Sequence, residues 1–202
     1  MNPAARWVKA VGDRVAAAAA LVVLAPLLIA VALLIRVTSP GPVLYRRHVL
    51  GLHGVAFDAF KFRTMVVNAD ALLRAQPELW GAFATNSKIR NDPRVTAVGG
   101  GLRKLSLDEL PQLFNVVRGQ MSLVGPRMIA PDEADKYGAA LDKRLSVKPG
   151  MTGLWQVQGR QETEYAQRIE LDLQYIDQWS LWLDLVILVK TIPAVLSMKG
   201  AY

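Results

Sequence analysis

The chain has 202 residues, of which 52% are apolar, and a formal net charge of +7 with a pI near 9.9. This length favours a single domain, and the charge favours a polyanionic partner such as nucleic acid, anionic lipid or a phosphorylated substrate. The absence of cysteine excludes disulfides and thiolate metal sites. The only histidines are His48 and His53, which disfavours a zinc site.

Residues 15–35 form an unbroken apolar run, which as a helix of about 1.5 Å rise per residue would just cross a hydrocarbon layer of about 30 Å. Three interpretations compete: a spanning anchor, a signal peptide, and a re-entrant helix that enters and leaves by the same face. A signal peptide is disfavoured, because the run continues through residues 33–35, beyond the apparent cleavage site at 30–32.

The flanks of this run are basic on both sides: Arg6, Lys9 and Arg14 before it, and Arg36, Arg46 and Arg47 after it. The distribution of positive charge therefore makes both ends look cytoplasmic. Pro26 lies near the centre, where it breaks a backbone hydrogen bond and bends a helix. A re-entrant helix satisfies both observations. Because proline also occurs in ordinary spanning helices, the residues alone leave both interpretations open.

The next part of the chain predicts short strands followed mainly by helices. Residues 43–47 and 55–62 are aromatic and branched and flank a turn between Gly51 and Gly54, which predicts a hairpin. An extended or turning segment is predicted at 122–127, loops at 91–94 and 99–101, and a turn at 148–153 that leads into 154–157. Helices are predicted at 66–73, 77–85, 108–117, 131–142 and 162–178.

Residues 179–193 form a second apolar stretch, which Asp184 and Lys190 interrupt, so a membrane span is disfavoured. Trp179 and Trp182 favour a helix lying in the membrane interface, with a core helix as the alternative. The predicted fold class is α+β: a compact, mostly helical, membrane-associated domain with short strands. Residues 1–38 would form the N-terminal re-entrant helix, and residues 39–202 a domain ending in a C-terminal interfacial amphipathic helix.

Asp108 and Glu109 form an acidic pair within a strongly basic region. Adjacent carboxylates among cations suit a site that handles phosphates through a divalent metal, with one carboxylate as nucleophile or base. The segment from Ser106 to Glu109 also fits a helix capping box, with Ser106 as the N-cap, and this alternative stays open. Pro111 counts against it, because a proline beyond the first helical turn costs a backbone hydrogen bond.

Several basic residues lie on predicted loops or strand ends, where small domains place binding residues. Lys61 and Arg63 alternate along a predicted strand and would share a face. The others follow turns or flank the acidic pair: Arg94, Arg103, Arg127 and Arg160. Each one alone fits a solvated surface charge, but the group suits phosphate oxygens, which arginine binds through two parallel hydrogen bonds. Walker A and Gly-x-Gly-x-x-Gly motifs are absent from the sequence.

Eight motifs occur in order along the chain: Gly41-Pro-Val-Leu-Tyr-Arg46, Phe60-Lys-Phe-Arg-Thr-Met65, Asp92-Pro-Arg-Val-Thr96, Leu102-Arg-Lys-Leu-Ser-Leu-Asp-Glu-Leu-Pro-Gln112, Ser122-Leu-Val-Gly-Pro-Arg127, Lys148-Pro-Gly-Met-Thr-Gly153, Gly159-Arg160 and Asp172-Leu-Gln-Tyr175-Ile-Asp-Gln-Trp-Ser180. With this order and spacing, the chain resembles the bacterial sugar transferases, which are monotopic phosphoglycosyl transferases acting on polyprenyl phosphate. The resemblance covers about residues 9–196.

The resemblance implies transfer of a sugar-1-phosphate from a UDP-sugar to a polyprenyl phosphate such as undecaprenyl phosphate. Asp108 would be the nucleophile, forming a covalent phosphosugar intermediate and releasing UMP, and Asp108 and Glu109 would hold Mg²⁺. Arg127 would lie near phosphate, Arg160 would contact the nucleotide, and Pro26 would bend the re-entrant helix. The enzyme would start polysaccharide or glycoconjugate assembly at the cytoplasmic face of the bacterial inner membrane, without nucleic acid. The sugar and the oligomeric state are not readable from the sequence.

The chain departs from the family pattern at five places. Ala25 stands where a serine usually precedes the proline, and Val49 where a basic residue is common. Gln120 replaces an aspartate, Met128 replaces the second proline of a Pro-Arg-Pro motif, and Gly100-Gly101 replace bulkier residues. We expect the change at Gln120 to remove a supporting acidic contact, and the change at Met128 to make the loop that carries Arg127 less rigid. The acidic pair is kept, so we expect an active enzyme.

Two other functions fit parts of the sequence. A membrane-tethered basic scaffold that binds anionic lipid or nucleic acid explains the charge and the apolar run, but leaves the acidic pair unused. A lipid phosphatase would use a similar site, but would release inorganic phosphate rather than UMP. Polytopic sugar-phosphate transferases are excluded by the single long apolar run.

Overall fold

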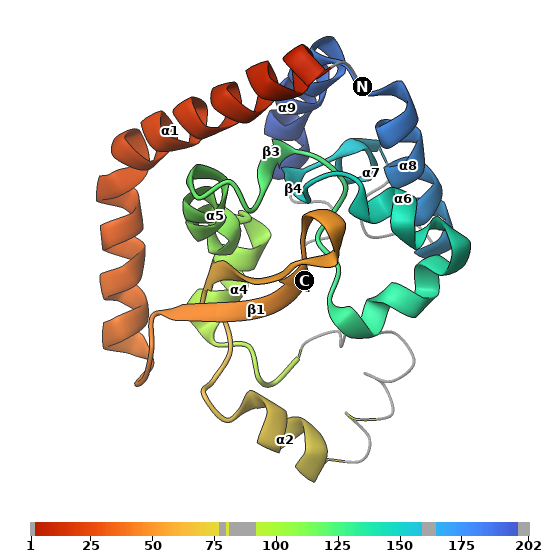
Figure 1. The fold of residues 1–202 in the computed structure, drawn as a ribbon. Helices are drawn as coiled ribbons and strands as arrows, with labels where there is room; N and C mark the ends of the chain where they lie inside the picture. Colours follow the sequence, from red (N-terminus) through yellow and green to blue (C-terminus); the bar gives the residue numbers. More distant parts are fainter. Residues whose placement is uncertain (1–2, 77–79, 81–91, 159–164, 198–202) are drawn as a thin grey trace.

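The computed structural model describes residues 3–76, 80, 92–158 and 165–197. They form a mixed, mostly helical molecule with short strands (Figure 1), which confirms this part of the predicted fold class. In chain order the elements are α1 (Pro3–Thr38), β1 (Leu44–Leu50), η1 (Leu52–Gly54), β2 (Ala56–Phe62), α2 (Ala69–Ala75), α4 (Ala97–Lys104), η2 (Leu107–Gln112), α5 (Leu113–Val117), β3 (Ser122–Val124), η3 (Pro131–Ala140), α6 (Leu141–Leu145), β4 (Gly150–Thr152), α7 (Leu154–Gln158), α8 (Tyr165–Gln178) and α9 (Leu181–Leu196), where η marks a 3₁₀-helix.

Helix α1 bends part-way along its length and runs along two sides of the molecule (Figure 1). Pro26 lies inside this helix. Its first half packs through Ala17 into a core cluster with Val49, Leu113 and Met121. In its second half, Val31 and Ile35 are buried and pack into a separate cluster with Phe62 and Leu102. Each half is therefore attached to the rest of the protein through its own core.

The outer surface of α1 stays apolar and exposed. Among the described residues, α1 is the helix that is long and apolar enough to cross a membrane, and only 11% of its most apolar stretch is buried. The exposed side chains include Trp7, Val15, Val22, Val23, Ile29, Leu33 and Val37. A continuous apolar surface of this kind is typical of contact with a membrane or another apolar partner.

The hairpin predicted at 43–47 and 55–62 is confirmed. Strands β1 and β2 pair antiparallel, with Tyr45 opposite Lys61. The turn η1 contains His53 at φ 56°, a left-handed conformation that non-glycine residues adopt rarely. Val49, Phe57 and Ala59 face the core, and by the register of the hairpin Tyr45, Arg47 and Lys61 continue the same face toward the cavity described below.

The second sheet has two parallel strands, β3 and β4, in which Ser122 pairs with Gly150. Helices α8 and α9 cover it through a third core cluster that includes Val124, Leu154, Tyr175 and Ile187. The buried Asp184 of α9 ties this region together. It accepts hydrogen bonds from Tyr175 Oη at 2.7 Å and Trp179 Nε1 at 3.1 Å, and forms an ion pair with Lys9 Nζ at 2.6 Å.

In helix α9 an acidic side chain faces the interior and apolar side chains face outward, which is the reverse of an amphipathic helix on the surface of a soluble protein. Its acidic residue Asp184 is buried, whereas its exposed face carries Leu181, Trp182, Leu185, Val189, Ile192 and Leu196. One face of α9 packs into the third core cluster through Ile187, while the other is exposed and apolar, and the predicted membrane-interface role of the exposed face stays a prediction. The beginning of α9 lies beside the beginning of α1, which the Lys9–Asp184 ion pair joins, so that the molecule presents two exposed apolar helices.

The loop predicted at 99–101 is wrong, because these glycines lie inside α4. Thr96 caps this helix, with its Oγ1 accepting from the backbone N–H of Gly99 at 2.9 Å. A Cβ added at Gly99 would lie 2.1 Å from the carbonyl oxygen of Thr64. A glycine is needed there because two backbones touch, and not because the chain turns.

Several helix predictions were correct in type but not in extent. Pro111 divides the helix predicted at 108–117 into η2 and α5, and a kink at Gly138 interrupts η3, which α6 follows directly. Helix α2 begins at Ala69 rather than at residue 66. The capping box is not formed, because Ser106 has φ 54° and makes no cap hydrogen bond through its side chain. The helix predicted at 77–85 lies almost wholly outside the described residues.

Candidate active site

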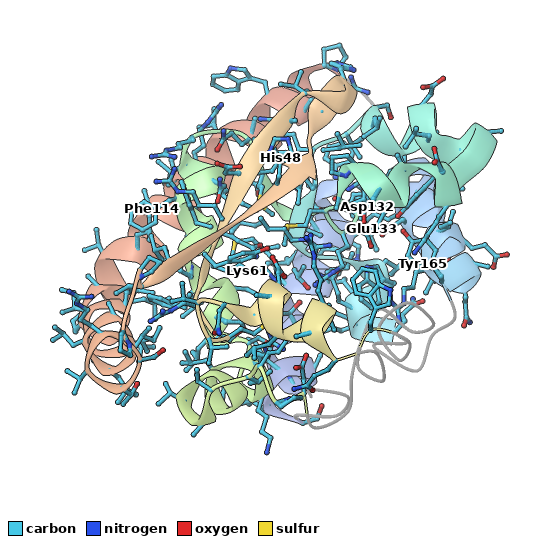
Figure 2. The ribbon with its side chains drawn as sticks, turned by 90° about the horizontal axis from the view of Figure 1, so that it is seen from below. His48, Lys61, Phe114, Asp132, Glu133 and Tyr165 are labelled. Carbon is cyan, nitrogen blue, oxygen red and sulfur yellow. The ribbon has the colours of Figure 1, made fainter. Side chains whose placement is uncertain are left out.

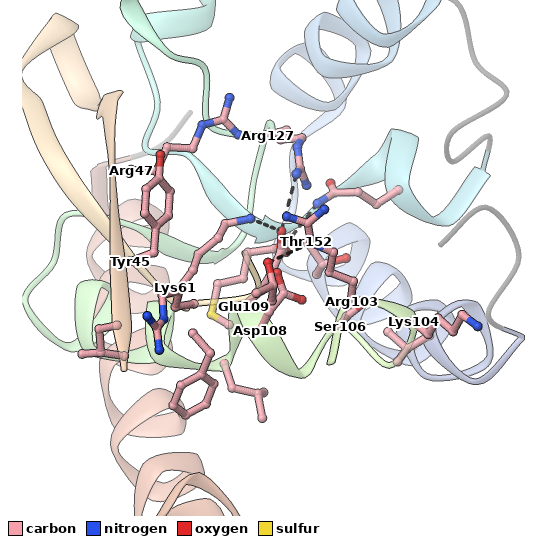
Figure 3. Close-up of a pocket in the computed structure, with 18 of the residues that line it drawn as sticks. Tyr45, Arg47, Lys61, Arg103, Lys104, Ser106, Asp108, Glu109, Arg127 and Thr152 are labelled. Carbon is pink, nitrogen blue, oxygen red and sulfur yellow. Dashed lines mark hydrogen bonds and ion pairs between the residues drawn. The ribbon is translucent and has the colours of Figure 1, made fainter. Parts of the chain in front are cut away.

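A cavity of about 800 Å³ opens between the hairpin, α4, η2, α7 and α9 (Figure 3). Its ionisable lining has six cations and three carboxylates, which are Arg47, Lys61, Arg63, Arg103, Lys104 and Arg127 against Asp70, Asp108 and Glu109. This excess of positive charge suits an anionic ligand. Helix α9 contributes a mainly apolar part of the lining through Leu188, Ala194 and Val195.

The acidic pair lies on η2, where the 3₁₀ geometry and Pro111 fix its orientation. Lys61 Nζ donates to Oε1 of Glu109 at 2.6 Å, and Arg127 Nη2 approaches the same oxygen at 3.4 Å (Figure 3). Burial alone would raise the pKa of Glu109, but the charges of Lys61 and Arg127 lower it to about 2. Glu109 is therefore ionised at neutral pH.

Asp108 is only 9% exposed, yet it lines the cavity. Burial raises its pKa to about 6, with Glu109 adding to this effect and Lys61 and Arg103 opposing it. The two neighbouring carboxylates can therefore have different roles. Close cations stabilise the anion of Glu109, whereas the anion of Asp108 is stabilised less. Asp108 is the better candidate for a reactive group.

Three of the predicted phosphate-binding residues surround this pair. Lys61 comes from β2, Arg127 from the loop after β3, and Arg103 from the end of α4, where its Nε donates to Thr64 Oγ1 at 2.8 Å. Figure 3 shows Lys61 and Arg127 directed toward Glu109. In Figure 2 Lys61 lies near the centre of the view and Phe114 on the side of α1. Residues far apart in sequence thus converge at one place.

The other three predicted phosphate-binding residues have a different outcome. Arg63 borders the cavity but is buried, and its guanidinium donates to the carbonyl oxygens of Ser39 and Pro40 at 2.6 Å, just beyond α1. Arg94 is not among the cavity's lining residues and donates to both carboxylate oxygens of Asp92. Arg160 lies outside the described residues.

The structure also adds lining residues that the sequence analysis missed. Tyr45 and Arg47 alternate along β1 and face the cavity with Lys61, a placement that follows once the hairpin register is known. Trp155 is buried in the wall, with the guanidinium of Arg127 5.7 Å from its ring centre and that of Arg168 at 5.0 Å. The contact with Trp155 helps to hold the Arg127 side chain over the cavity.

The loop that carries Arg127 is supported from behind by Arg144. This buried side chain donates to the backbone carbonyls of Pro126 and Arg127, and the charge of Asp172 lies close enough to affect its pKa. Met128, where the family pattern has proline, is buried in the core. Gln120 accepts from Asn115 Nδ2 at 2.9 Å and does not line the cavity. These two departures therefore affect packing away from the acidic pair.

The carboxylates of Asp108 and Glu109 suit a magnesium ion that is held partly by the phosphates of a substrate. The described residues contain no cluster of three or more His, Asp or Glu side chains arranged to hold a metal. Mg²⁺, however, is commonly held by one or two carboxylates together with the phosphates of a substrate. Asp108 and Glu109 supply hard oxygen ligands at the wall of a basic cavity, so their chemistry suits a shared site of this type.

A family model described as bacterial sugar transferase matches residues 4–198. The chain is 45% identical to the exopolysaccharide production protein ExoY of Rhizobium meliloti (strain 1021), over 94% of this chain and 86% of that protein. It is 46% identical to a UDP-glucose:undecaprenyl-phosphate glucose-1-phosphate transferase of Caulobacter vibrioides, over 96% of this chain and 72% of that protein. It is 45% identical to an undecaprenyl-phosphate galactose phosphotransferase of Salmonella typhimurium, over 98% of this chain and 42% of that protein.

Proposed function

The chain belongs to the bacterial sugar transferase family, and we propose that it transfers a sugar-1-phosphate from a UDP-sugar to undecaprenyl phosphate, releasing UMP. The observation that carries this proposal is the buried carboxylate of Asp108 on the wall of a basic cavity that is also lined by the apolar helix α9. The names of the relatives in Caulobacter and Salmonella support undecaprenyl phosphate as the acceptor.

Asp108 is the nucleophile in this proposal. One carboxylate oxygen attacks the phosphorus that bears the sugar, forming an acyl phosphate while the bond to the bridging oxygen breaks and UMP leaves with that oxygen. An oxygen of undecaprenyl phosphate then attacks the same phosphorus, and the Asp108 carboxylate departs. With a pKa of about 6, raised by burial, this carboxylate is ionised at pH 7 and remains less stabilised than a solvated one.

The surrounding cations make attack on an anionic diphosphate feasible. Lys61, Arg103 and Arg127 reduce the repulsion between the carboxylate and the phosphate oxygens and favour the charge that develops in the transition state. Mg²⁺, held by Asp108 and Glu109 together with the diphosphate, would supply further charge neutralisation. Glu109 keeps Lys61 and Arg127 in position through its ion pairs.

The membrane-facing part of the proposal rests on α1 and α9. Both helices expose apolar side chains, and α9 also lines the cavity through Leu188, Thr191 and Val195. The cavity thus extends from the acidic pair to a helix suited to lipid, which would let a prenyl chain remain in the bilayer while its phosphate reaches Asp108. We place the enzyme at the cytoplasmic face of the inner membrane, with α1 re-entrant and bent at Pro26.

The experiment is a UMP-release assay on the purified full chain with Mg²⁺, undecaprenyl phosphate and a panel of UDP-sugars. Wild type should release UMP from at least one sugar, and Asp108→Asn should lose about 10³-fold or more of that rate. An active relative serves as the assay control. Release of inorganic phosphate in place of UMP would reject the transfer reaction and indicate a phosphatase.

A further inference from the structure

A second cavity, of about 230 Å³, lies on the inner side of the first half of α1. It is separate from the acidic pair, and its walls come from α1, the η1 turn, the segment after α6 and the end of α8. Its charged lining has four cations against one carboxylate, which are Arg6, Lys9, Arg14 and Lys148 against Asp13, with His53 nearby. This excess of positive charge suits an anionic ligand.

The one carboxylate in this lining is already engaged. Asp13 forms an ion pair with Lys9 at 3.4 Å and accepts a hydrogen bond from Ser122 Oγ. Lys9 is in turn paired with Asp184 at 2.6 Å. In the described part of the chain, neither Arg14 nor Lys148 has a hydrogen bond or ion pair of its own. Arg14 and Lys148 are therefore two positive charges at the same cavity, and the one nearby carboxylate, Asp13, is already paired with Lys9.

Arg14 and Lys148 line the same cavity of about 230 Å³. The guanidinium of Arg14 lies against Gly119, where φ is +78° and an added Cβ would be 2.2 Å from Nη2. Burial lowers the pKa of Lys148, and the charges of Arg14 and Lys9 lower it further while Asp13 opposes them. Lys148 thus lies close enough to Arg14 to be repelled by it, and an anion between them would relieve that repulsion.

The surface beside this cavity is apolar. Val11 precedes Arg14 by three residues and Trp7 precedes it by seven, so these side chains lie on the same side of α1 as Arg14. Trp7, Val11 and Val15 are exposed. A ligand with its anionic end at Arg14 and Lys148 would therefore have apolar protein surface beside it, which fits an amphiphile better than a free ion.

We propose that Arg14 and Lys148 bind the phosphate group of an anionic membrane phospholipid, whose acyl chains lie along Trp7, Val11 and Val15. The site is distinct from the substrate cavity. It uses Lys148 of the Lys148-Pro-Gly-Met-Thr-Gly153 motif, a residue that the transfer reaction leaves unassigned. The inference rests on the proposal that α1 enters a bilayer, but it does not depend on the reaction at Asp108. Such a lipid would fasten the first half of α1 to the segment after α6.

The test is native mass spectrometry of the full chain in nonionic detergent, titrated separately with phosphatidylglycerol, phosphatidylcholine and inorganic phosphate. Wild type should retain phosphatidylglycerol, and Lys148→Met and Arg14→Met should each bind it about tenfold more weakly, as expected for loss of one charge-assisted contact. The matched controls are Lys143→Met and Arg74→Met, which remove the same charges elsewhere and should bind as wild type does. Lys148→Arg should keep most of the affinity.

Equal retention of phosphatidylglycerol by wild type and both cavity variants would overturn the proposal. Binding of inorganic phosphate with the same sensitivity to Lys148→Met, without preference for phosphatidylglycerol over phosphatidylcholine, would support the anion site but reject a lipid as its source. Arg14 is exposed, so its variant is expected to fold even if Lys148→Met does not. UMP release measured on the same samples separates the two proposals, because lipid retention does not require turnover.

Discussion

Lys61 Nζ lies 2.6 Å from Oε1 of Glu109, an ion pair that joins β2 to η2 at the wall of the cavity. Arg127 reaches the same oxygen from a third segment. Consequently the pKa of Glu109 is about 2, whereas burial raises that of its neighbour Asp108 to about 6. One carboxylate organises the cations, and the other is left to react.

Replacing Lys61 by methionine should reduce UMP release by about 100-fold, because it removes a cation directed at developing negative charge and leaves Glu109 with one weaker partner. Lys61→Arg should recover a substantial part of the rate. The control is Lys136→Met, which removes an exposed lysine of η3 that lies over the Tyr165 ring, outside the cavity. Equal rates for Lys61→Met and Lys136→Met would contradict the role given to Lys61.

Arg144→Met should lower stability by about 3 kcal/mol, because it removes the cation that most favours the charged form of the buried Asp172 and leaves two backbone carbonyls without this donor. For a chain of this length, this corresponds to a fall of about 10 °C in the thermal midpoint in detergent. Lys143→Met, on the same helix but in an exposed pair with Asp177, should change the midpoint by about 2 °C or less. Similar shifts in the two variants would argue against a supporting role for Arg144.

Arg94 is predicted to stabilise the folded protein through its ion pair with Asp92. Burial raises the pKa of Asp92, but the hydrogen bonds from Arg94 outweigh it and hold that pKa below its ordinary value of 3.8. The stabilisation is thus fully present above pH 3.8 and is lost as the pH falls through the lowered folded-state pKa.

Arg94→Gln should therefore lower the thermal midpoint at pH 7, and the difference from wild type should shrink below about pH 4. The control is Arg74→Gln on α2, which should give no pH-dependent difference. If Arg94→Gln instead lost activity without any change in midpoint, the original assignment of Arg94 to phosphate binding would be restored.

The membrane topology can be tested with two single cysteines, because the chain has none of its own. Gly12 has open space around its Cα, and Val37 is 84% exposed, so cysteine fits at both positions. If α1 is re-entrant, Gly12→Cys and Val37→Cys should both react with a membrane-impermeant maleimide in inverted inner-membrane vesicles and neither in intact spheroplasts. Labelling of one site from each side would establish a spanning helix.

The hairpin and the long helix were predictable because both rest on local patterns: alternating aromatic and branched residues in one case, a continuous apolar run in the other. Gly99 shows where such patterns stop. Three consecutive glycines indicate a loop, but the contact between Gly99 and the Thr64 backbone joins segments 35 residues apart, and local sequence carries no sign of it.

The acidic pair and three of its cations were identified from their types and order, yet their grouping depended on tertiary contacts. Arg63 and Arg127 look equivalent in sequence, since both are arginines at the end of an extended segment. Arg63 is occupied by the carbonyls of Ser39 and Pro40, while Arg127 reaches Glu109. Only the partners distinguish them. Arg94 had a visible clue, because Asp92 is two residues away and forms its ion pair.

The most direct test of the account is to look for the covalent intermediate. Wild-type protein, incubated with a UDP-sugar that supports UMP release and Mg²⁺ but without undecaprenyl phosphate, should gain the mass of one sugar phosphate by intact-protein mass spectrometry. Peptide mapping should place it on Asp108, adding undecaprenyl phosphate should remove it, and Asp108→Asn should not acquire it. An adduct on another residue, or full turnover by Asp108→Asn, would contradict the account.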